Sequence, residues 1–318
     1  PMAAWGGTRW MWNGVCCFVL LQEVAFAYVK PVDQCQEDEQ HCTINPWQPR
    51  YNHGFRPPIE LPCLSEEEAE SAFQHIISLE EYWDVRRPGV EKSLASMPDM
   101  MNLFVKLGIK YFTLGAFINY DSTKNEHYRR RQNEMNPIME KHFEPIYAKV
   151  RAALEKQLGE PVEMNDGSLF AFRIYRADIL SPEAIPYVTK LHSPPHYDTL
   201  WKFQRWPEGF HFNHTISFTL PIRLPKAGSA LRIYDVYHRG DSDEWYDGNM
   251  NPIPPITTHS WRDLPFRDHE YHVGHLALHS GHELHCIPPA REGIHKNDFR
   301  ITLQGWGVWG NGKWVLFS

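Results

Sequence analysis

The sequence lacks an excess of basic residues. It contains 32 Lys and Arg against 39 Asp and Glu, which gives a formal net charge of -7. Nucleic-acid-binding surfaces need a basic face, so this balance argues against a nucleic-acid partner. A basic run at residues 129–131 is flanked by Glu126 and Glu134, and we interpret it as the solvated face of a helix.

The sequence also lacks an uninterrupted apolar run long enough to span a bilayer. The candidate stretch, residues 15–28, is interrupted by Gln22 and Glu23. A membrane-spanning helix needs about 20 predominantly apolar residues. We therefore interpret this stretch as a buried strand or helix and expect no membrane partner. No internal repeat or low-complexity tract is visible either.

The six cysteines include no Cys-x-x-Cys pair. That absence removes the usual sequence signature of a structural zinc site or a dithiol redox centre. Without an evident export signal, reduced thiols are the expectation for a chain of this length, and we predict a cytoplasmic protein. Cys35 and Cys42 could form a disulfide only in an oxidising compartment.

The first half of the sequence predicts helices. Ser65 and Glu68 form a capping box ahead of helically spaced apolar residues, so a helix is expected to begin there. Residues 126–158 are also mostly helical in pattern. Pro137 and Pro145 are expected to split or kink this second helix, because proline removes a backbone donor.

The second half of the sequence predicts strands. From residue 162 onward, short β-prone runs alternate with turns rich in Gly, Pro and Asp, a pattern typical of an antiparallel sandwich or barrel. Residues 238–268 show no periodicity and are expected to be a surface insertion. The expected strands are residues 168–175, 187–191, 214–220, 230–236, 271–279, 300–308 and 313–317.

These patterns predict a mainly β fold with flanking helices, in which the strands form a jelly-roll barrel. The 25 prolines argue against an all-helical fold. We expect one compact domain with three regions: an irregular N-terminal arm at residues 1–60, a helical support region at 61–160, and a jelly-roll catalytic core at 161–318. The sequence does not indicate an oligomeric state.

His196 and Asp198 form a His-x-Asp pair that follows Pro194 and Pro195. The prolines are expected to hold this segment in an extended or turn conformation. Residues i and i+2 of an extended chain point to the same side. A ring nitrogen and a carboxylate oxygen could therefore bind one divalent metal ion, which would need a third ligand.

His285 is the preferred third ligand, with His279 and His282 as alternatives. Residues 274–279 read as a strand closed by a glycine turn, and the next strand begins near His285, at the expected barrel mouth. Cys286 is expected to point away from the metal, because side chains alternate along a strand. Two His and one carboxylate on one face of an iron leave the opposite positions open, which is the layout of non-haem Fe(II) oxygenases.

The order of these residues resembles the Fe(II)/2-oxoglutarate-dependent oxygenase family. The resemblance rests on three features in sequence order: the His196-x-Asp198 pair, the distal His285, and Arg300-x-Thr302 on a late strand. It implies a double-stranded β-helix core and an Fe(II) ion held by the two His and the Asp. It also implies 2-oxoglutarate and O2 as cosubstrates, with ascorbate helpful in vitro.

Arg300 and Thr302 share a face of their expected strand, and an Arg can hold a carboxylate through two parallel hydrogen bonds. In the family such a pair binds the distal carboxylate of 2-oxoglutarate, so the resemblance assigns this role to Arg300 and Thr302. The stretch from the distal His to Arg300 is longer than the family's usual pattern, and Arg291 is a competing anchor. Tyr175 or Arg173 is a further candidate contact to the cosubstrate.

The resemblance implies attack on an unactivated C–H bond, with hydroxylation, desaturation and oxidative ring closure left open. Related iron halogenases replace the carboxylate ligand with a small residue, so Asp198 favours oxygen transfer or hydrogen abstraction. We expect a small substrate, an amino-acid derivative or natural-product precursor that could carry a carboxylate. The alternatives are a protein side chain, a lipid, or a non-catalytic jelly-roll binding module. Candidate pocket residues are Trp201, Arg205, Arg232, Tyr234 and Trp306.

Overall fold

The computed structural model describes residues 58–86, 110–118, 126–165, 167–180, 195–239, 244–247, 251–255, 260–288 and 295–318. All of them belong to one compact unit, residues 45–318. Most of the predicted N-terminal arm, the expected strand at 187–191, the Cys35–Cys42 pair and Arg291 lie outside the described residues. Among the helices described, none is both long and apolar enough to cross a membrane.

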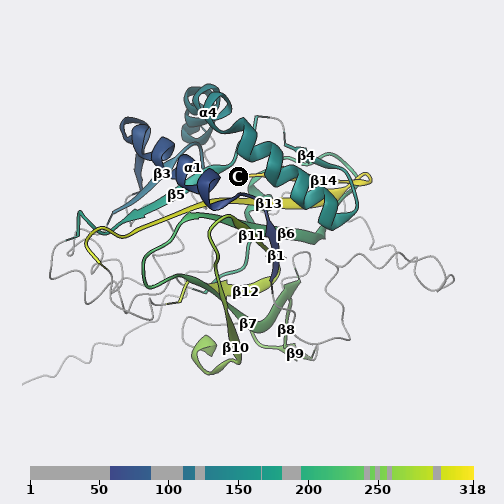
Figure 1. The fold of residues 1–318 in the computed structure, drawn as a ribbon. Helices are drawn as coiled ribbons and strands as arrows, with labels where there is room; N and C mark the ends of the chain where they lie inside the picture. Colours follow the sequence, from purple (N-terminus) through teal and green to yellow (C-terminus); the bar gives the residue numbers. More distant parts are fainter. Residues whose placement is uncertain are drawn as a thin grey trace, which may run out of the picture. The chain divides into compact units, whose positions relative to one another are not determined.

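The strands form two sheets (Figure 1). The larger sheet contains β1 (Ile59–Pro62), β2 (Asp84–Arg86), β3 (Tyr111–Leu114), β4 (Val162–Met164), β5 (Ala171–Arg176), β6 (Phe210–Arg223), β11 (His275–Ser280), β13 (Phe299–Gly310) and β14 (Lys313–Phe317). The smaller sheet contains β7 (Ala230–Arg239), β8 (Glu244–Asp247), β9 (Pro252–Ile253), β10 (Phe266–Glu270) and β12 (Glu283–Cys286). β4 and β14 pair in parallel.

The chain passes repeatedly between the two sheets. β6 lies in the larger sheet, β7 and β10 in the smaller, β11 in the larger, β12 in the smaller and β13 in the larger. Such alternation between two mainly antiparallel sheets is the jelly-roll arrangement, so the predicted mainly β fold with flanking helices is confirmed. The described strands remain in two sheets and do not close into a continuous barrel.

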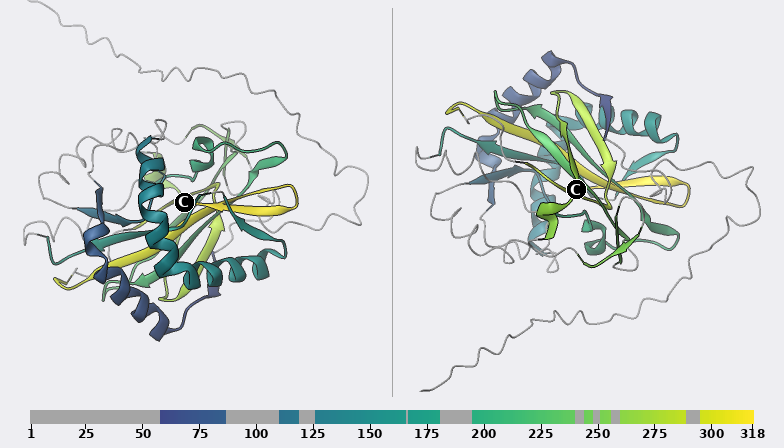
Figure 2. Two further views of the ribbon diagram at one scale, coloured as in Figure 1. Left: turned by 90° about the horizontal axis from the view of Figure 1, so that it is seen from above. Right: turned by 90° about the horizontal axis from the view of Figure 1, so that it is seen from below.

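Two helices, α1 (Glu66–Ser78) and α4 (Glu126–Leu158), cover one face of the larger sheet (Figures 1 and 2). Their buried side chains and those of the sheet form one apolar core. On β6 the core residues are Ile216, Phe218, Leu220 and Ile222, and Thr215, Ser217 and Thr219 alternate with them. Because side chains alternate along a strand, the hydroxyl-bearing residues face away from the helices, toward the smaller sheet.

The start of α1 is capped as the sequence predicts. The Ser65 Oγ accepts a hydrogen bond from the Glu68 backbone N–H at 3.2 Å, and the Ser65 N–H donates to Glu68 Oε2 at 3.0 Å. Pro137 and Pro145 do not split α4, because one helix contains both of them, but α4 bends sharply along its length (Figure 2), as expected of a helix kinked by proline. Both prolines lie on its exposed face. The carbonyl groups that lose their N–H partners there can be hydrated, so the helix continues.

Residues 238–268 are more regular than the expected insertion. They contain β8, β9 and the start of β10, and β10 pairs with β7 along its whole length. Strands as short as Pro252–Ile253 show no detectable period of two, which explains why the sequence pattern missed them. The other described expected strands overlap observed ones, although the strand expected at 271–279 begins only at His275.

Candidate metal centre

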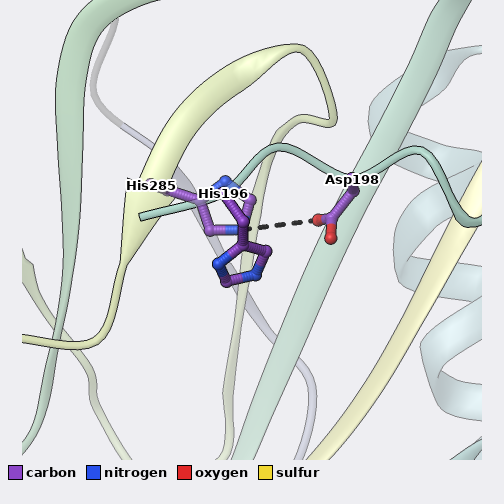
Figure 3. Close-up of side chains that lie close together, drawn as sticks. All are labelled: His196, Asp198 and His285. Carbon is purple, nitrogen blue, oxygen red and sulfur yellow. Dashed lines mark ion pairs between the residues drawn. The ribbon is translucent and has the colours of Figure 1, made fainter. Parts of the chain in front are cut away.

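The segment around His196 is fixed to the smaller sheet by a two-residue bridge. The His196 N–H donates to the His285 carbonyl at 2.9 Å, and the His285 N–H donates to the His196 carbonyl at 2.8 Å. Residues paired directly across such a bridge carry their side chains on the same face. The two imidazole rings accordingly lie with their centroids 4.5 Å apart (Figure 3).

Asp198 is positioned by the turn that precedes β12. Its N–H donates to the Gly281 carbonyl at 2.9 Å. A Cβ atom on Gly281 would lie 2.6 Å from Thr215 Oγ1, so the close approach of this turn to β6 requires glycine. The Asp198 carboxylate then faces the ring of His285, with Oδ2 3.4 Å from Nε2 (Figure 3).

One ligand atom from each of His196, Asp198 and His285 lies within 4.8 Å of the others. In the part of the chain that the structure describes, no other group of three metal-ligating residues meets this condition. His285 Nδ1 lies 2.8 Å from the Glu283 carbonyl, which can only accept, so Nδ1 is the donor in this contact and Nε2 is the ring nitrogen that faces the other ligands. Two ring nitrogens and one carboxylate oxygen suit a first-row divalent metal.

Asp198 is buried, with 6% of its surface exposed. Burial alone would raise the pKa of Asp198, but the neighbouring rings of His285 and His196 and the hydroxyl of Ser217 lower it below its ordinary value. The Ser217 hydroxyl donates to Asp198 Oδ2 at 2.5 Å. Asp198 is therefore a carboxylate at neutral pH, oriented by Ser217 toward the two rings.

We predict that Ser217→Ala lowers Fe(II) affinity about 10- to 100-fold, the usual effect of removing a group that orients a metal ligand. Equilibrium competition against a metal chelator under anaerobic conditions would measure this loss. Thr215→Val is the matched control, because Thr215 lies on the same face of β6 and its buried hydroxyl has no hydrogen-bond partner among the described residues. Equal loss in both variants would contradict the role of Ser217.

The alternative ligands lie outside the group of three. The His279 ring packs against His285 with centroids 4.7 Å apart, but its Nδ1 contacts the Ser280 carbonyl at 2.9 Å. Burial, followed by the neighbouring His285, lowers the pKa of His279 to about 3, so its ring is neutral. His282 is buried and is not among the three clustered ligands. Cys286 points away, toward the Tyr234 hydroxyl at 3.7 Å.

Arg300 and Tyr175 face each other across the β13–β5 pair. The Arg300 Nε donates to Ser229 Oγ at 3.0 Å, while Arg300 Nη2 is buried and has no hydrogen-bond partner in the described part of the chain. The Tyr175 hydroxyl is also buried and has no hydrogen-bond partner among the described residues. Burial lowers the pKa of Arg300 and raises that of Tyr175. Two donors without described acceptors indicate a place for an anionic ligand.

Thr302 is fully buried one step further along the same face of β13, where its Oγ1 lies 3.4 Å from Gln304 Nε2. Sequence reasoning missed Tyr271, whose side chain interacts with both Arg300 and Asp198. Its ring centroid is 5.8 Å from the Arg300 guanidinium carbon, and Thr219 hydrogen-bonds to its side chain. The one sequence signal for Tyr271 was its position in the strand expected at residues 271–279.

The candidate pocket residues are dispersed. Arg205 is exposed, and Arg232 bonds Asp268 at 2.7 and 2.9 Å. Arg232 lies on the opposite face of β7 from Ile233, the residue paired with His285, so it points away from the metal ligands. Tyr234 shares that outer face and contacts Cys286. Trp201 stacks on Phe212, and Trp306 lies opposite Ser217 in the β13–β6 register.

No family model matches the sequence, and no curated protein matches it. Solved structures give matches of low identity. An N-substituted L-amino acid dioxygenase from Burkholderia ambifaria AMMD, in complex with alpha-ketoglutarate, is 12% identical with a TM-score of 0.43, over 82% of this chain and 86% of that one. SnoN, a non-heme alpha-ketoglutarate-dependent epimerase from nogalamycin biosynthesis, is 10% identical with a TM-score of 0.40, over 79% and 80%.

A third match, EvdO2 from Micromonospora carbonacea var. aurantiaca, is 11% identical with a TM-score of 0.39, over 80% of this chain and 87% of that one. With TM-scores below 0.5, these matches leave the function to be derived from the side chains of this chain.

Proposed function

We propose that this chain is an Fe(II)- and 2-oxoglutarate-dependent oxygenase of the non-haem iron family. The observation that carries the proposal is the convergence of His196, Asp198 and His285, whose ligand atoms lie within 4.8 Å of one another. A facial set of two His and one carboxylate is the ligand set of this enzyme class. The backbone N–H of each of these three residues donates a hydrogen bond that fixes its segment in place.

The three residues fit an iron ion better than a structural zinc ion. Structural zinc sites are closed by four protein ligands, often including Cys. Cys286, the nearest cysteine in sequence, lies on the opposite face of β12, and no fourth ligand joins the group among the described residues. The set of three leaves coordination positions for small reactants, which supports a catalytic site over a non-catalytic binding module.

Arg300, Tyr175 and Thr302 are the residues we assign to 2-oxoglutarate. Arg300 Nη2, which has no hydrogen-bond partner among the described residues, would donate to the distal carboxylate, with the Tyr175 hydroxyl as a second donor. The Ser229 hydroxyl holds the Arg300 Nε, which fixes the plane of the guanidinium. A planar, fixed fork of donors binds a carboxylate more specifically than a flexible ammonium group does.

When bound, Fe(II) with 2-oxoglutarate and O2 supplies the oxidant that removes a hydrogen atom from an unactivated C–H bond. The protein holds the metal through His196, Asp198 and His285 and orients the cosubstrate through Arg300. The Ser217 hydroxyl donates to the Asp198 carboxylate and helps to hold its pKa below the ordinary value. Hydroxylation, desaturation and oxidative ring closure share this first step, and we propose a small-molecule substrate such as an amino-acid derivative or natural-product precursor.

Succinate production is the test of the proposed function. Protein purified anaerobically is mixed with Fe(II), 2-oxoglutarate, ascorbate and O2, with and without candidate substrates. We expect the wild-type chain to form succinate even when turnover is uncoupled, and we expect Asp198→Ala to give only the background without protein. Equal succinate from the two proteins across all candidate substrates would rule out the oxygenase assignment.

A further inference from the structure

The residue between two of the metal ligands points the opposite way from them. His196 and Asp198 face the metal position, and side chains alternate along an extended segment, so Tyr197 faces away. Its half-buried ring packs against an apolar cluster on the outer face of the smaller sheet. The buried members of this cluster on β7 and β12 are Tyr234, Val236, Leu284 and Cys286.

The neighbours of the third ligand are anchored in the same cluster. Leu284 and Cys286 flank His285, and both are buried on the outer face of β12. Each of the three metal ligands is therefore adjacent in sequence to a side chain that packs behind the site. This packing directs the ligand side chains toward the opposite face, where the metal would bind.

Three rings enclose the segment that carries His196 and Asp198. The Tyr197 ring stacks on the His238 ring, with centroids 3.8 Å apart and 19° between the ring planes. Trp245 meets both of these rings edge to face, with centroid distances of 5.0 Å to Tyr197 and 5.1 Å to His238. These are the stacked and edge-to-face arrangements that aromatic rings prefer, so the plane of the Tyr197 ring is fixed from two directions.

His238 also contacts the turn that holds the Asp198 backbone. The His238 N–H donates to the His282 carbonyl at 2.9 Å, and the Asp198 N–H donates to the adjacent Gly281 carbonyl at 2.9 Å. His238 lies opposite Trp245 in the β7–β8 register. The buried His238 thus links the ring before Asp198 to the turn that accepts its hydrogen bond.

We propose that Tyr197, His238 and Trp245 are positioning residues of the metal centre. Their rings hold the peptide between His196 and Asp198 in the one orientation that turns both ligands toward the metal. A ligand pair held in this way loses little conformational freedom when the metal binds, which raises metal affinity. The inference rests on the metal centre of the proposed function and adds the residues that support it from behind.

Variants of Tyr197 and Trp245 test this role through Fe(II) affinity, measured anaerobically by competition against a chelator. We expect Tyr197→Leu and Trp245→Leu each to weaken Fe(II) binding about 10- to 100-fold, the usual effect of changing a residue that orients a metal ligand. Tyr197→Phe and Trp245→Phe keep a flat ring and should bind nearly as tightly as the wild type. Co(II) bound in place of Fe(II) gives a second readout, because its visible absorption spectrum reports the arrangement of the ligands. That spectrum should change in the Leu variants and return in the Phe variants.

Phe73→Leu is the matched control. Phe73 meets Phe299 edge to face at 5.5 Å on the helix-covered face of the larger sheet. Its loss should lower the Tm of the metal-free protein and leave both the Fe(II) affinity and the Co(II) spectrum unchanged. Unchanged Fe(II) affinity in both Leu variants of the positioning residues would overturn their role, and so would equal losses in the Leu and Phe variants.

Failure of the proposed function gives a different result. A wild-type protein that binds Fe(II) but forms no succinate would refute the oxygenase assignment alone, because metal affinity decides the role of the three rings. A wild-type protein that binds no Fe(II) would overturn both.

Discussion

His285→Ala is expected to abolish succinate formation and to lower Fe(II) affinity by at least about 100-fold. Changes to residues that merely orient metal ligands typically reduce affinity 10- to 100-fold, and loss of a ligand itself should exceed that range. The His285 Nε2 faces the Asp198 carboxylate at 3.4 Å, so its removal leaves only two donors at the site. Anaerobic metal titration and the succinate assay measure the two effects separately.

His282→Ala is the matched control for this experiment. His282 is as buried as His285 and lies three positions earlier, yet it is not among the clustered ligands. We expect this variant to bind one Fe(II) per chain and to form succinate. If His282→Ala lost iron and His285→Ala retained it, the third ligand would be wrongly assigned.

Arg300→Leu should raise the KM for 2-oxoglutarate about 100-fold or more. Removing one partner of a buried charge pair costs about 3–5 kcal/mol, and every 1.4 kcal/mol is a factor of ten in affinity. Fe(II) affinity should stay within a few-fold of the wild-type value, because Arg300 is not among the clustered metal ligands. Succinate formation measured over a range of 2-oxoglutarate concentrations gives the KM directly.

Two further variants make the Arg300 result specific. Arg300→Lys keeps the charge but loses the planar fork, so its KM should fall between those of the wild type and Arg300→Leu. Arg205→Leu removes an exposed arginine and should leave the KM unchanged. An unchanged KM in Arg300→Leu would place the cosubstrate anchor elsewhere in the chain.

Local chemistry made several features predictable from the sequence. The capping box at Ser65 can be predicted from the sequence alone, because its two partners, Ser65 and Glu68, lie three residues apart. The alternation of apolar and polar residues on long strands such as β6 and β13 predicts both the strands and the face that carries polar groups. The His196-x-Asp198 pair was visible because both side chains come from one short extended segment.

Other features depend on tertiary contacts that no local pattern encodes. The continuity of α4 through its prolines depends on which side of the helix faces water. The role of Ser217 follows from its place on β6 beside the Asp198 turn, two segments far apart in sequence. That Arg232 points away from the metal ligands became clear only from the strand register, which places it on the opposite face of β7 from the residue paired with His285.

Crystals loaded anaerobically with Fe(II) and measured at the iron absorption edge would test the metal centre most directly. We predict one anomalous peak per chain that contacts a ring nitrogen of His196, an Asp198 carboxylate oxygen and His285 Nε2, with no fourth protein ligand. A peak at any other position, or a fourth protein side chain that completes a closed tetrahedral site, would contradict the assignment of an open catalytic iron.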